Sequence, residues 1–396
     1  MVSSFDADCE YMKTNDRQGK VRVALMSYAM DNRPAKGTAL YTRKLIENLL
    51  EDDRFEWYLV HFDRVDDPIY KRAHEIIMPE LKLPVATRFV RTMLFFWKYR
   101  KNRFDIIHWF QPRLYPFFWL APATHIVVTA HGAGDITAGG QFPPSRHIFN
   151  FILKHCNAAV SAIIADSQFG KEEIVEYYHA ARDRVRTIYL GGGESYQMIN
   201  KDIARAQIKE RYGINDEFIL DISRHVVHKN IPALIRAYVS LQVEGVQLPT
   251  LVIVGNMHQA FGVAQAEVRN SPKPDDIIFI NYVAQEDLNA LYSAAELFVF
   301  PSLNEGFGLP IVEAFASGTP VITSNVTSMP EIAGDAALIV DPTNVSDIAA
   351  KIRALLTDET LQKELIEKGL SRAREFSWER TASNTAVLYL DLLTTP

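Results

Sequence analysis

Two carboxylates stand eight residues apart in this chain, at Glu305 and Glu313, and a glycine turn lies between them. Gly306 and Gly308 flank a phenylalanine, and a proline follows where a helix would begin. Such a loop presents backbone N–H groups and a helix N-terminus to an anionic ligand. The carboxylates suit hydroxyl groups beside that anion, and a sugar nucleotide carries both kinds of group. The spacing therefore favours a nucleotide-sugar site.

Arg224 and Lys229 lie between a strand predicted at residues 218–223 and a helix predicted at residues 231–242. In a loop at the carboxyl end of a strand, a guanidinium and an ammonium can converge on one diphosphate. The following helix adds the positive end of its dipole. An isolated pair of this kind is equally compatible with two solvated surface cations, but the glycine turn favours a diphosphate site. Asp221 interrupts the same apolar strand, and the pattern offers no role for it.

The first half of the chain offers weaker candidates in loops that follow predicted strands. Gly37, with Thr38 behind it, would let backbone N–H groups approach a phosphate or a sugar. His131 follows an apolar strand and precedes small residues, so it could face a cleft and donate to a sugar hydroxyl or handle a proton. A structural histidine is the alternative. The sequence contains neither a Gly-x-Ser-x-Gly elbow nor a full Gly-x-Gly-x-x-Gly fingerprint, which counts against a hydrolase and a nicotinamide dehydrogenase.

One basic and aromatic segment, residues 88–103, contains no acidic residue. Its six basic residues are Arg88, Arg91, Lys98, Arg100, Lys101 and Arg103, and its aromatic residues are Phe89, Phe95, Phe96, Trp97 and Tyr99. Such a mixture suits an interfacial helix on an anionic membrane. A helix packed by its aromatic side, with solvated cations, is an equal alternative.

The elements that must position these residues alternate between short apolar strands and helices throughout the chain. The strands are predicted at residues 21–27, 57–61, 106–109, 125–129, 162–165 and 185–189 in the first half, and at 218–223, 250–254, 277–280, 297–300, 321–323 and 337–340 in the second. This pattern predicts an α/β protein with parallel sheets covered on both faces. We predict two doubly wound domains, at residues 1–195 and 196–374, and a final helical segment at residues 375–396. Ligands of such sheets bind beyond the carboxyl ends of the strands, so the site should lie in the cleft between the domains.

The composition is that of an ordinary soluble enzyme, with 48% hydrophobic and 23% charged residues among 396. A net charge of −6 gives no signal for nucleic acid. The two cysteines, Cys9 and Cys156, match no metal or disulfide pattern and fit a reducing compartment. The polar first twenty residues and the lack of a long apolar run predict a cytoplasmic protein, peripheral at most on the inner face of a membrane.

Taken together, these motifs resemble those of the retaining glycosyltransferases of family 4, also called group 1, which adopt the GT-B fold. The likeness covers most of the chain and is most specific over residues 218–345. It rests on Ser223-Arg224, Lys229-Asn230, Phe300-Pro-Ser-Leu, the Glu305-to-Glu313 signature, Gly318-Thr-Pro, Met329-Pro-Glu331 and Phe376-Ser-Trp378.

The resemblance implies a role for each matching residue of the second domain. Arg224 and Lys229 would bind the donor diphosphate and stabilise the leaving group. Glu305 would contact the sugar hydroxyls, Glu313 the ribose, and the backbone at Val283 the base. Backbone N–H groups near the sugar and phosphate would come from Gly306, Phe307, Gly308 and Leu309.

In the first domain, the resemblance places Gly37, with Thr38, in the family's glycine loop and His131 near the donor sugar. An acidic residue often follows this histidine in the family, whereas this chain has Gly132. The last helix, after about residue 375, would cross back onto the first domain.

The implied reaction moves a hexose from a nucleotide-diphosphate sugar to a saccharide or lipid-linked acceptor in polysaccharide biosynthesis, with retention of configuration. It requires no cofactor and no divalent metal. The motif slightly favours UDP-glucose as the donor, and a GDP-mannose-dependent mannosyltransferase is the alternative. A nucleotide-sugar epimerase and a non-catalytic sugar-nucleotide-binding module are more distant alternatives.

Overall fold

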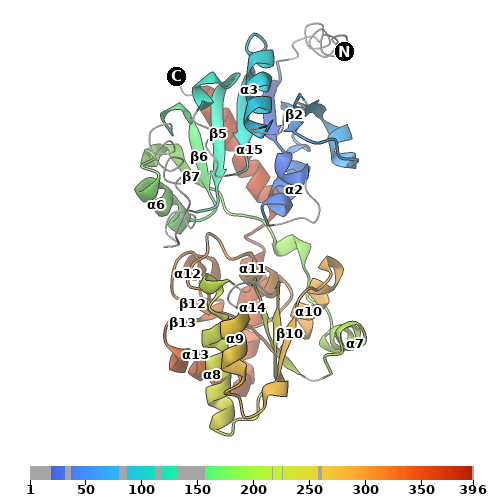
Figure 1. The fold of residues 1–396 in the computed structure, drawn as a ribbon, viewed down its shortest axis with the longest axis vertical. Helices are drawn as coiled ribbons and strands as arrows, with labels where there is room; N and C mark the ends of the chain where they lie inside the picture. The colour runs from blue at the N-terminus through green and yellow to red at the C-terminus, as the bar shows by residue number, and fades with distance from the viewer. Residues whose placement is uncertain are drawn as a thin grey trace.

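The computed structural model describes residues 19–31, 37–79, 87–111, 117–132, 157–215, 217–224, 226–256 and 261–394. Over these residues the chain forms two parallel sheets, which lie in the upper and lower halves of Figure 1. This arrangement confirms the predicted fold class of two Rossmann-like α/β domains. Cys9 and Cys156 lie outside the described residues.

The first sheet has seven parallel strands in the order β3-β2-β1-β4-β5-β6-β7. The strands are β1 (Val21–Met26), β2 (Phe55–His61), β3 (His74–Ile77), β4 (Phe104–Trp109), β5 (Ala123–Ala130), β6 (Ala162–Ala165) and β7 (Val185–Thr187). Helices α3 (Thr87–Tyr99) and α6 (Gln168–Tyr177) cover one face, and α2 (Gly37–Leu49) covers the other. Because all strands are parallel, their carboxyl ends gather polar residues along one edge.

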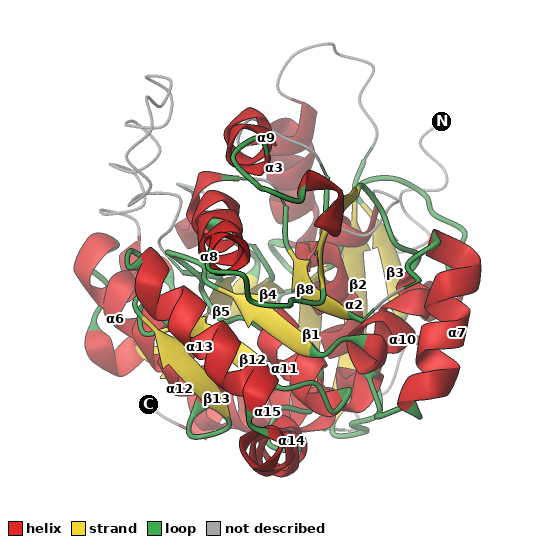
Figure 2. Ribbon diagram, turned by 90° about the horizontal axis from the view of Figure 1, so that it is seen from below, coloured by secondary structure: helices red, strands yellow, loops and turns green. Residues whose placement is uncertain are grey.

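The second sheet has six parallel strands in the order β10-β9-β8-β11-β12-β13. The strands are β8 (Phe218–Ile222), β9 (Thr250–Val254), β10 (Ile277–Ile280), β11 (Leu297–Phe300), β12 (Val321–Ser324) and β13 (Ala337–Val340). Figure 2 shows helices on both sides of the strands. One face packs on α8 (Ile231–Val243), α9 (Phe261–Val268) and α13 (Val345–Thr357), and the other on α7 (Lys201–Tyr212), α10 (Leu288–Ala294) and α11 (Leu309–Ala316).

The chain crosses between the domains twice, and glycines allow the two crossings to touch. After α12 (Met329–Ala333) and α14 (Glu359–Ala373), helix α15 (Trp378–Thr394) packs against α2 of the first domain, as Figure 1 shows. A Cβ atom at Gly191 would lie 2.2 Å from the Trp378 nitrogen, and one at Gly193 would lie 2.1 Å from the Ala373 oxygen. No larger residue fits at either crossing, which explains the glycine run between the domains.

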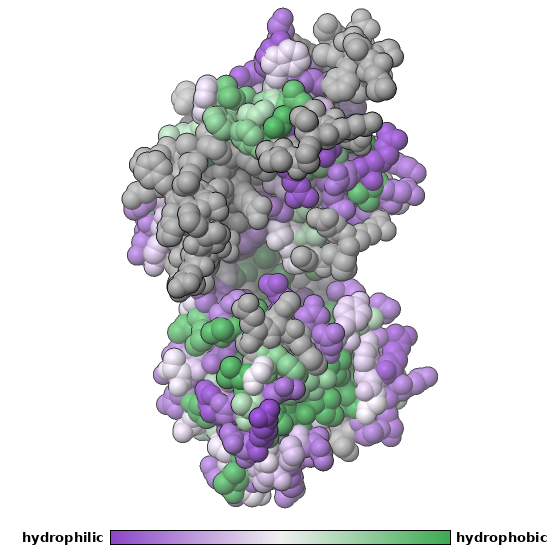
Figure 3. All heavy atoms as spheres, in the orientation of Figure 1, coloured by the Kyte–Doolittle hydropathy of each residue, from purple (hydrophilic) through white to green (hydrophobic). Residues whose placement is uncertain are grey.

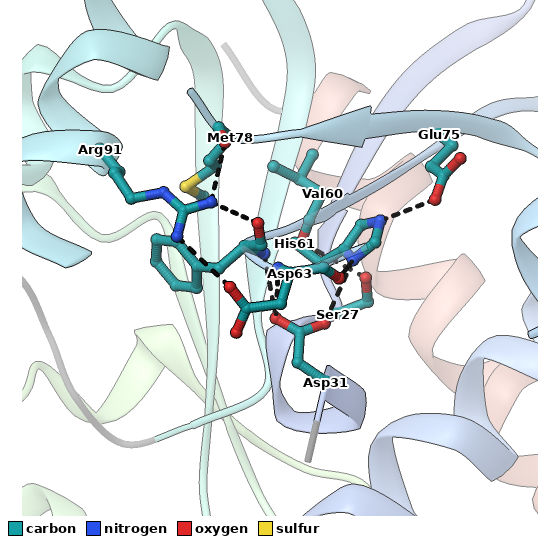
Figure 4. A network of polar contacts seen from close by, with 9 residues as sticks. Ser27, Asp31, Val60, His61, Asp63, Glu75, Met78 and Arg91 are labelled. Carbon is teal, nitrogen blue, oxygen red and sulfur yellow. Dashed lines mark hydrogen bonds and ion pairs between the residues drawn. The ribbon is translucent and has the colours of Figure 1, made fainter. Parts of the chain in front are cut away.

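The basic and aromatic segment forms most of α3 and the turn that follows it, but one of its cations points inward. Arg91 is buried and donates to the backbone oxygens of Phe62, Met78 and Pro79, and it lies 3.4 Å from the carboxylate of Asp63. Figure 4 shows this guanidinium among the carboxyl ends of β2 and β3. Arg91 is therefore neither a solvated nor a membrane-facing cation, because its donors are committed to buried carbonyl groups.

Candidate active site

Lys229 and Glu305, which lie far apart in the sequence, form an ion pair in the second domain. The Lys229 Nζ atom lies 2.5 Å from Glu305 Oε1, and the Ser302 hydroxyl donates to the same oxygen at 2.6 Å. Both charged side chains are only about 15% exposed, at 14% and 15%. Lys229 also lies over the ring of Phe300, 4.7 Å from its centroid. The pair therefore holds one cation and one carboxylate in fixed positions at the carboxyl end of β11.

Backbone hydrogen bonds join the two loops that carry this pair. The carbonyl of His228 accepts from the Leu303 N–H at 2.7 Å and from the Ser302 hydroxyl at 3.2 Å. Asn230 adopts a left-handed conformation with φ of 58° and donates from its side chain to the Pro301 carbonyl at 3.1 Å. These hydrogen bonds hold the loop after β8 against the loop after β11, and they bring Lys229 and Glu305 together.

The glycine turn is fixed from behind by the residues that precede α12. The Glu305 N–H donates to the Thr327 hydroxyl at 3.2 Å, and the Ser328 hydroxyl donates to the carbonyls of Glu305 and Phe307 at 2.9 Å each. Gly308 has φ of 106°, a backbone conformation that strongly favours glycine. This turn leads directly into α11 at Leu309, so the helix N-terminus lies beside Glu305.

Glu313 lies one turn into α11, where a tyrosine fixes its side chain. The Tyr292 hydroxyl donates to Glu313 Oε2 at 2.8 Å. Burial raises the pKa of the Glu313 carboxyl, and the hydrogen bonds from the Tyr292 and Tyr196 hydroxyls oppose that rise. A carboxyl oriented in this way can accept a hydrogen bond from a sugar hydroxyl.

The other predicted residues of the second domain lie at the edges of this centre. Arg224 lies two residues after the end of β8, and it is exposed. Val283 is buried in the loop after β10, and the neighbouring Tyr282 is 72% exposed. Of the two basic residues proposed for the diphosphate, the structure therefore brings only Lys229 into contact with Glu305.

The first domain contributes His131 at the carboxyl end of β5, next to the end of β6. Its Nδ1 atom lies 2.6 Å from Asp166 Oδ2, and its Nε2 atom lies 3.2 Å from the Phe110 carbonyl oxygen. The Asp166 carboxylate raises the pKa of His131, although burial by itself would lower it. Asp166 is a residue that the sequence reasoning missed. It directly follows a correctly predicted strand, as His131 does, and that position was the available signal.

Gly37 and Thr38, the two other candidates of the first domain, begin a helix that reaches His131. Gly37 is exposed at the first residue of α2, and the Thr38 carbonyl accepts from the Thr42 hydroxyl at 2.8 Å. One turn further, the ring of Tyr41 packs edge-on against the ring of His131, with centroids 4.8 Å apart. The helix thus positions His131, and the loop before it lies outside the described residues.

The two domains meet at Gly306. A Cβ atom on this residue would lie 2.5 Å from the His131 carbonyl oxygen, so only glycine fits. The Ser167 hydroxyl donates to the Gly306 carbonyl at 2.8 Å, and Glu331 accepts from the Gln168 and Phe169 N–H groups at 2.7 and 3.1 Å. The glycine turn of the second domain therefore packs against the strand ends of the first. Among the described residues, no group of three or more His, Cys, Asp or Glu could hold a metal ion.

Comparison with known proteins identifies the family. The model of group 1 glycosyl transferases matches residues 204–372, and that of glycosyltransferase family 4 matches residues 35–191. The Escherichia coli serotype-specific mannosyltransferase WbdA is 36% identical over 233 residues, 56% of this chain but only 28% of that protein.

One further relative and one solved structure extend the match. The E. coli O-antigen chain mannosyltransferase B is 35% identical over 268 residues, 66% of this chain and 69% of that protein. The sucrose-phosphate synthase of Thermosynechococcus elongatus superposes with a TM-score of 0.71 at 22% identity and covers 94% of this chain and 99% of its own. The chain belongs to the group 1 glycosyltransferases of family 4 and has the GT-B fold.

Proposed function

We propose that the protein transfers a mannosyl residue from GDP-mannose to a saccharide or lipid-linked acceptor, with retention of configuration. The observation that carries the proposal is the Lys229–Glu305 pair beside the glycine turn and the α11 N-terminus. The motif alone slightly favours UDP-glucose, but the names of the related E. coli proteins favour mannose.

In this mechanism the second domain stabilises charge on the leaving diphosphate. Lys229 and Arg224 each carry one positive charge and Glu305 one negative charge, so the set attracts an anion. Glu305 already accepts from Lys229 and Ser302 through Oε1, which leaves its other oxygen for sugar hydroxyls. Glu313, held by Tyr292, would bind the ribose. Glu305 thus acts as a sugar-binding group, and the reaction proceeds by front-face substitution rather than through a covalent glycosyl-enzyme.

A panel of nucleotide sugars tests the donor. At about 100 times its dissociation constant, a true donor stabilises the fold by about 2.7 kcal/mol, so its presence raises the melting temperature. GDP-mannose should produce the largest shift, and an equal shift with UDP-glucose would overturn the donor assignment. NMR of the anomeric proton in the product tests retention, and transfer in the presence of EDTA tests metal independence.

Two other functions predict different outcomes in the same assay. An epimerase would convert the donor without any acceptor, so incubation of GDP-mannose alone separates it from a transferase. A non-catalytic binding module would show the thermal shift without turnover. The binding-module outcome is not expected, because the Lys229–Glu305 pair and the oriented Glu313 are both in place.

The exposed face of α3 is the second part of the proposal, as a peripheral membrane surface. Trp97 is 64% exposed, with the Arg100 guanidinium 4.2 Å from its ring centroid, and Trp119 in the short helix Phe118–Leu120 is 68% exposed. Figure 3 shows apolar and polar atoms side by side at this upper end of the first domain. Aromatic side chains next to cations suit the interface of an anionic bilayer. No helix among the described residues is long and apolar enough to cross a membrane.

Liposome co-sedimentation at low salt tests this surface. Wild-type protein should bind vesicles that contain an anionic lipid, and the variant Trp97→Ala/Trp119→Ala should lose most of that binding. Arg374→Glu, at an exposed position in the second domain, serves as the control and should bind normally. Equal binding to neutral vesicles, or no binding by the wild type, would contradict the membrane surface.

A further inference from the structure

Two histidines lie at the carboxyl end of the first sheet, and their hydrogen-bond partners differ in kind. His108 lies 2.5 Å from the Tyr389 hydroxyl and 2.8 Å from the Thr129 hydroxyl. A hydroxyl can donate or accept, so a neutral imidazole satisfies both contacts. Burial and the neighbouring His131 lower the pKa of His108 to about 3. His108 is therefore neutral.

His131 is flanked only by groups that accept. An ionised carboxylate and a backbone carbonyl have no proton to give, and they lie 2.6 and 3.2 Å from the two ring nitrogens. A neutral imidazole has a single N–H and would leave one of these contacts without a proton. Both contacts are satisfied when the ring is doubly protonated and carries a positive charge.

The burial of Asp166 leads to the same conclusion. Its residue exposure is 3%, and its Oδ1 atom has no hydrogen-bond partner among the described residues. A buried carboxylate with a free oxygen is costly unless a cation compensates it. His131 is the cation in contact with it, so each group supplies the charge that the other requires.

The surroundings of His131 contain no other cation to compete for this role among the described contacts. Tyr41 approaches from α2, neutral His108 from β4, and Glu173 of α6 faces the following Gly132, 3.1 Å from the position of a Cβ atom there. From the second domain, the backbone of Gly306 touches the His131 carbonyl. The charge thus lies at the junction of the two domains, next to the turn that follows Glu305.

We infer that Asp166 is a positioning residue that keeps His131 doubly protonated, so that the first domain holds a fixed ion pair at the donor site. His131 then acts as a cation, not as a proton acceptor, because both of its N–H groups are committed. The consequence for sugar transfer rests on the proposed function, since the ion pair would fix the His131 ring and backbone beside the turn that follows Glu305. The protonation itself does not depend on that function.

NMR titration of the histidine rings between pH 5.5 and 9.5 tests the protonation, with His131→Gln used to assign the signal. In the wild type the His131 midpoint should lie above the ordinary value of about 6.5. In Asp166→Asn it should fall by at least about one unit, and Asp166→Glu should restore part of the shift. Asp105→Asn is the control, because Asp105 accepts from the Arg22 N–H at 2.8 Å near the opposite end of the sheet, and it should leave the midpoint unchanged.

The outcomes separate this inference from the proposed function. A wild-type midpoint below 6.5, or an unchanged midpoint in folded Asp166→Asn, overturns the inference whether or not transfer is observed. If Asp166→Asn does not fold, the wild-type midpoint and Asp166→Glu decide. The pH profile of kcat adds a second test: the alkaline limb of Asp166→Asn should begin at least about one unit lower than that of the wild type. A uniform loss at every pH would show a merely structural Asp166.

Discussion

The two halves of the cleft are built in different ways. In the second domain most of the site lies in one continuous segment, where Glu305, the glycine turn and Glu313 follow one another through a loop and one helix, and Lys229 joins it from the loop after β8. In the first domain the polar groups come from the ends of separate strands, so that His131, Asp166 and Phe110 meet only after the sheet has formed. A site of the first kind leaves a motif in the sequence, and a site of the second kind leaves single residues after strands.

The comparison also separates two uses of charge. Glu305 retains a carboxylate oxygen and Lys229 retains ammonium protons that their contact does not use, so both can bind a ligand. In the first domain, both ring nitrogens of His131 already have partners, as do both ring nitrogens of His61, which Figure 4 shows beside Asp31 and Glu75. The second domain therefore supplies groups that can bind the donor, and the first supplies groups whose positions are fixed by their partners. The following variants test this difference between the two domains.

The largest effect is expected for Lys229→Ala. Loss of a charged donor that stabilises the transition state costs about 3–4 kcal/mol, so kcat for transfer should fall by about two to three orders of magnitude. Steady-state kinetics with the donor identified by thermal shift measures this. Lys229→Arg retains the charge but not the compact ammonium, and it should recover part of the rate. Near-normal kcat in Lys229→Ala would remove this residue from the mechanism.

The variant Gly306→Ala changes the contact between the two domains. The added methyl would lie 2.5 Å from the His131 carbonyl, so the glycine turn must move away from the first domain. A displacement of about 1 Å at a reacting centre can cost about 100-fold, and we expect a loss of that order in kcat/KM. Gly262→Ala in α9 is the matched control, because a Cβ atom there meets nothing within 4 Å. Equal activity in the two variants would show that the contact at Gly306 is not needed for transfer.

The same difference explains how much could be predicted from the sequence. Strands predicted at residues 250–254, 277–280 and 297–300 agree with the structure, because short apolar runs between polar loops have few other arrangements. Strand β3 was missed because it is a four-residue edge strand that begins with His74 and Glu75. Neither polar residue gives the apolar signal of a buried strand.

Long-range contacts account for what the sequence could not show in the site. That Lys229 and Glu305 belong to one site could be inferred, because both flank recognisable turns, but their direct ion pair could not. The contacts of His131 with Asp166 and the Phe110 carbonyl could not, because they depend on the order of β4, β5 and β6 in the sheet. His108 and Tyr389, which are 281 residues apart, depend in addition on the path of α15.

Asp221 of the second domain resembles the polar groups of the first domain, because it is buried and belongs to no motif. Its side chain is fully buried, Oδ1 accepts from the Ser223 hydroxyl at 2.5 Å, and Oδ2 has no partner among the described residues. Burial raises the pKa of this carboxyl to about 7, although the Ser223 hydrogen bond opposes the rise. The folded protein therefore retains a proton on Asp221 that the unfolded chain releases near pH 4.

The smallest of these effects is therefore expected in stability rather than in transfer, for Asp221→Asn. Between about pH 4 and pH 7 the folded wild type binds more protons than the unfolded chain, so its free energy of unfolding falls as the pH rises. An asparagine does not titrate, so the free energy of unfolding of the variant should rise relative to that of the wild type by roughly 2.5 kcal/mol between pH 5 and pH 8. Urea unfolding of both proteins at the two pH values measures this difference. Ser223→Ala, which removes only the hydroxyl on Oδ1, should retain the wild-type fall with pH. If the difference between Asp221→Asn and the wild type is the same at both pH values, Asp221 is already ionised in the fold, and the second domain then holds a buried charge as the first does.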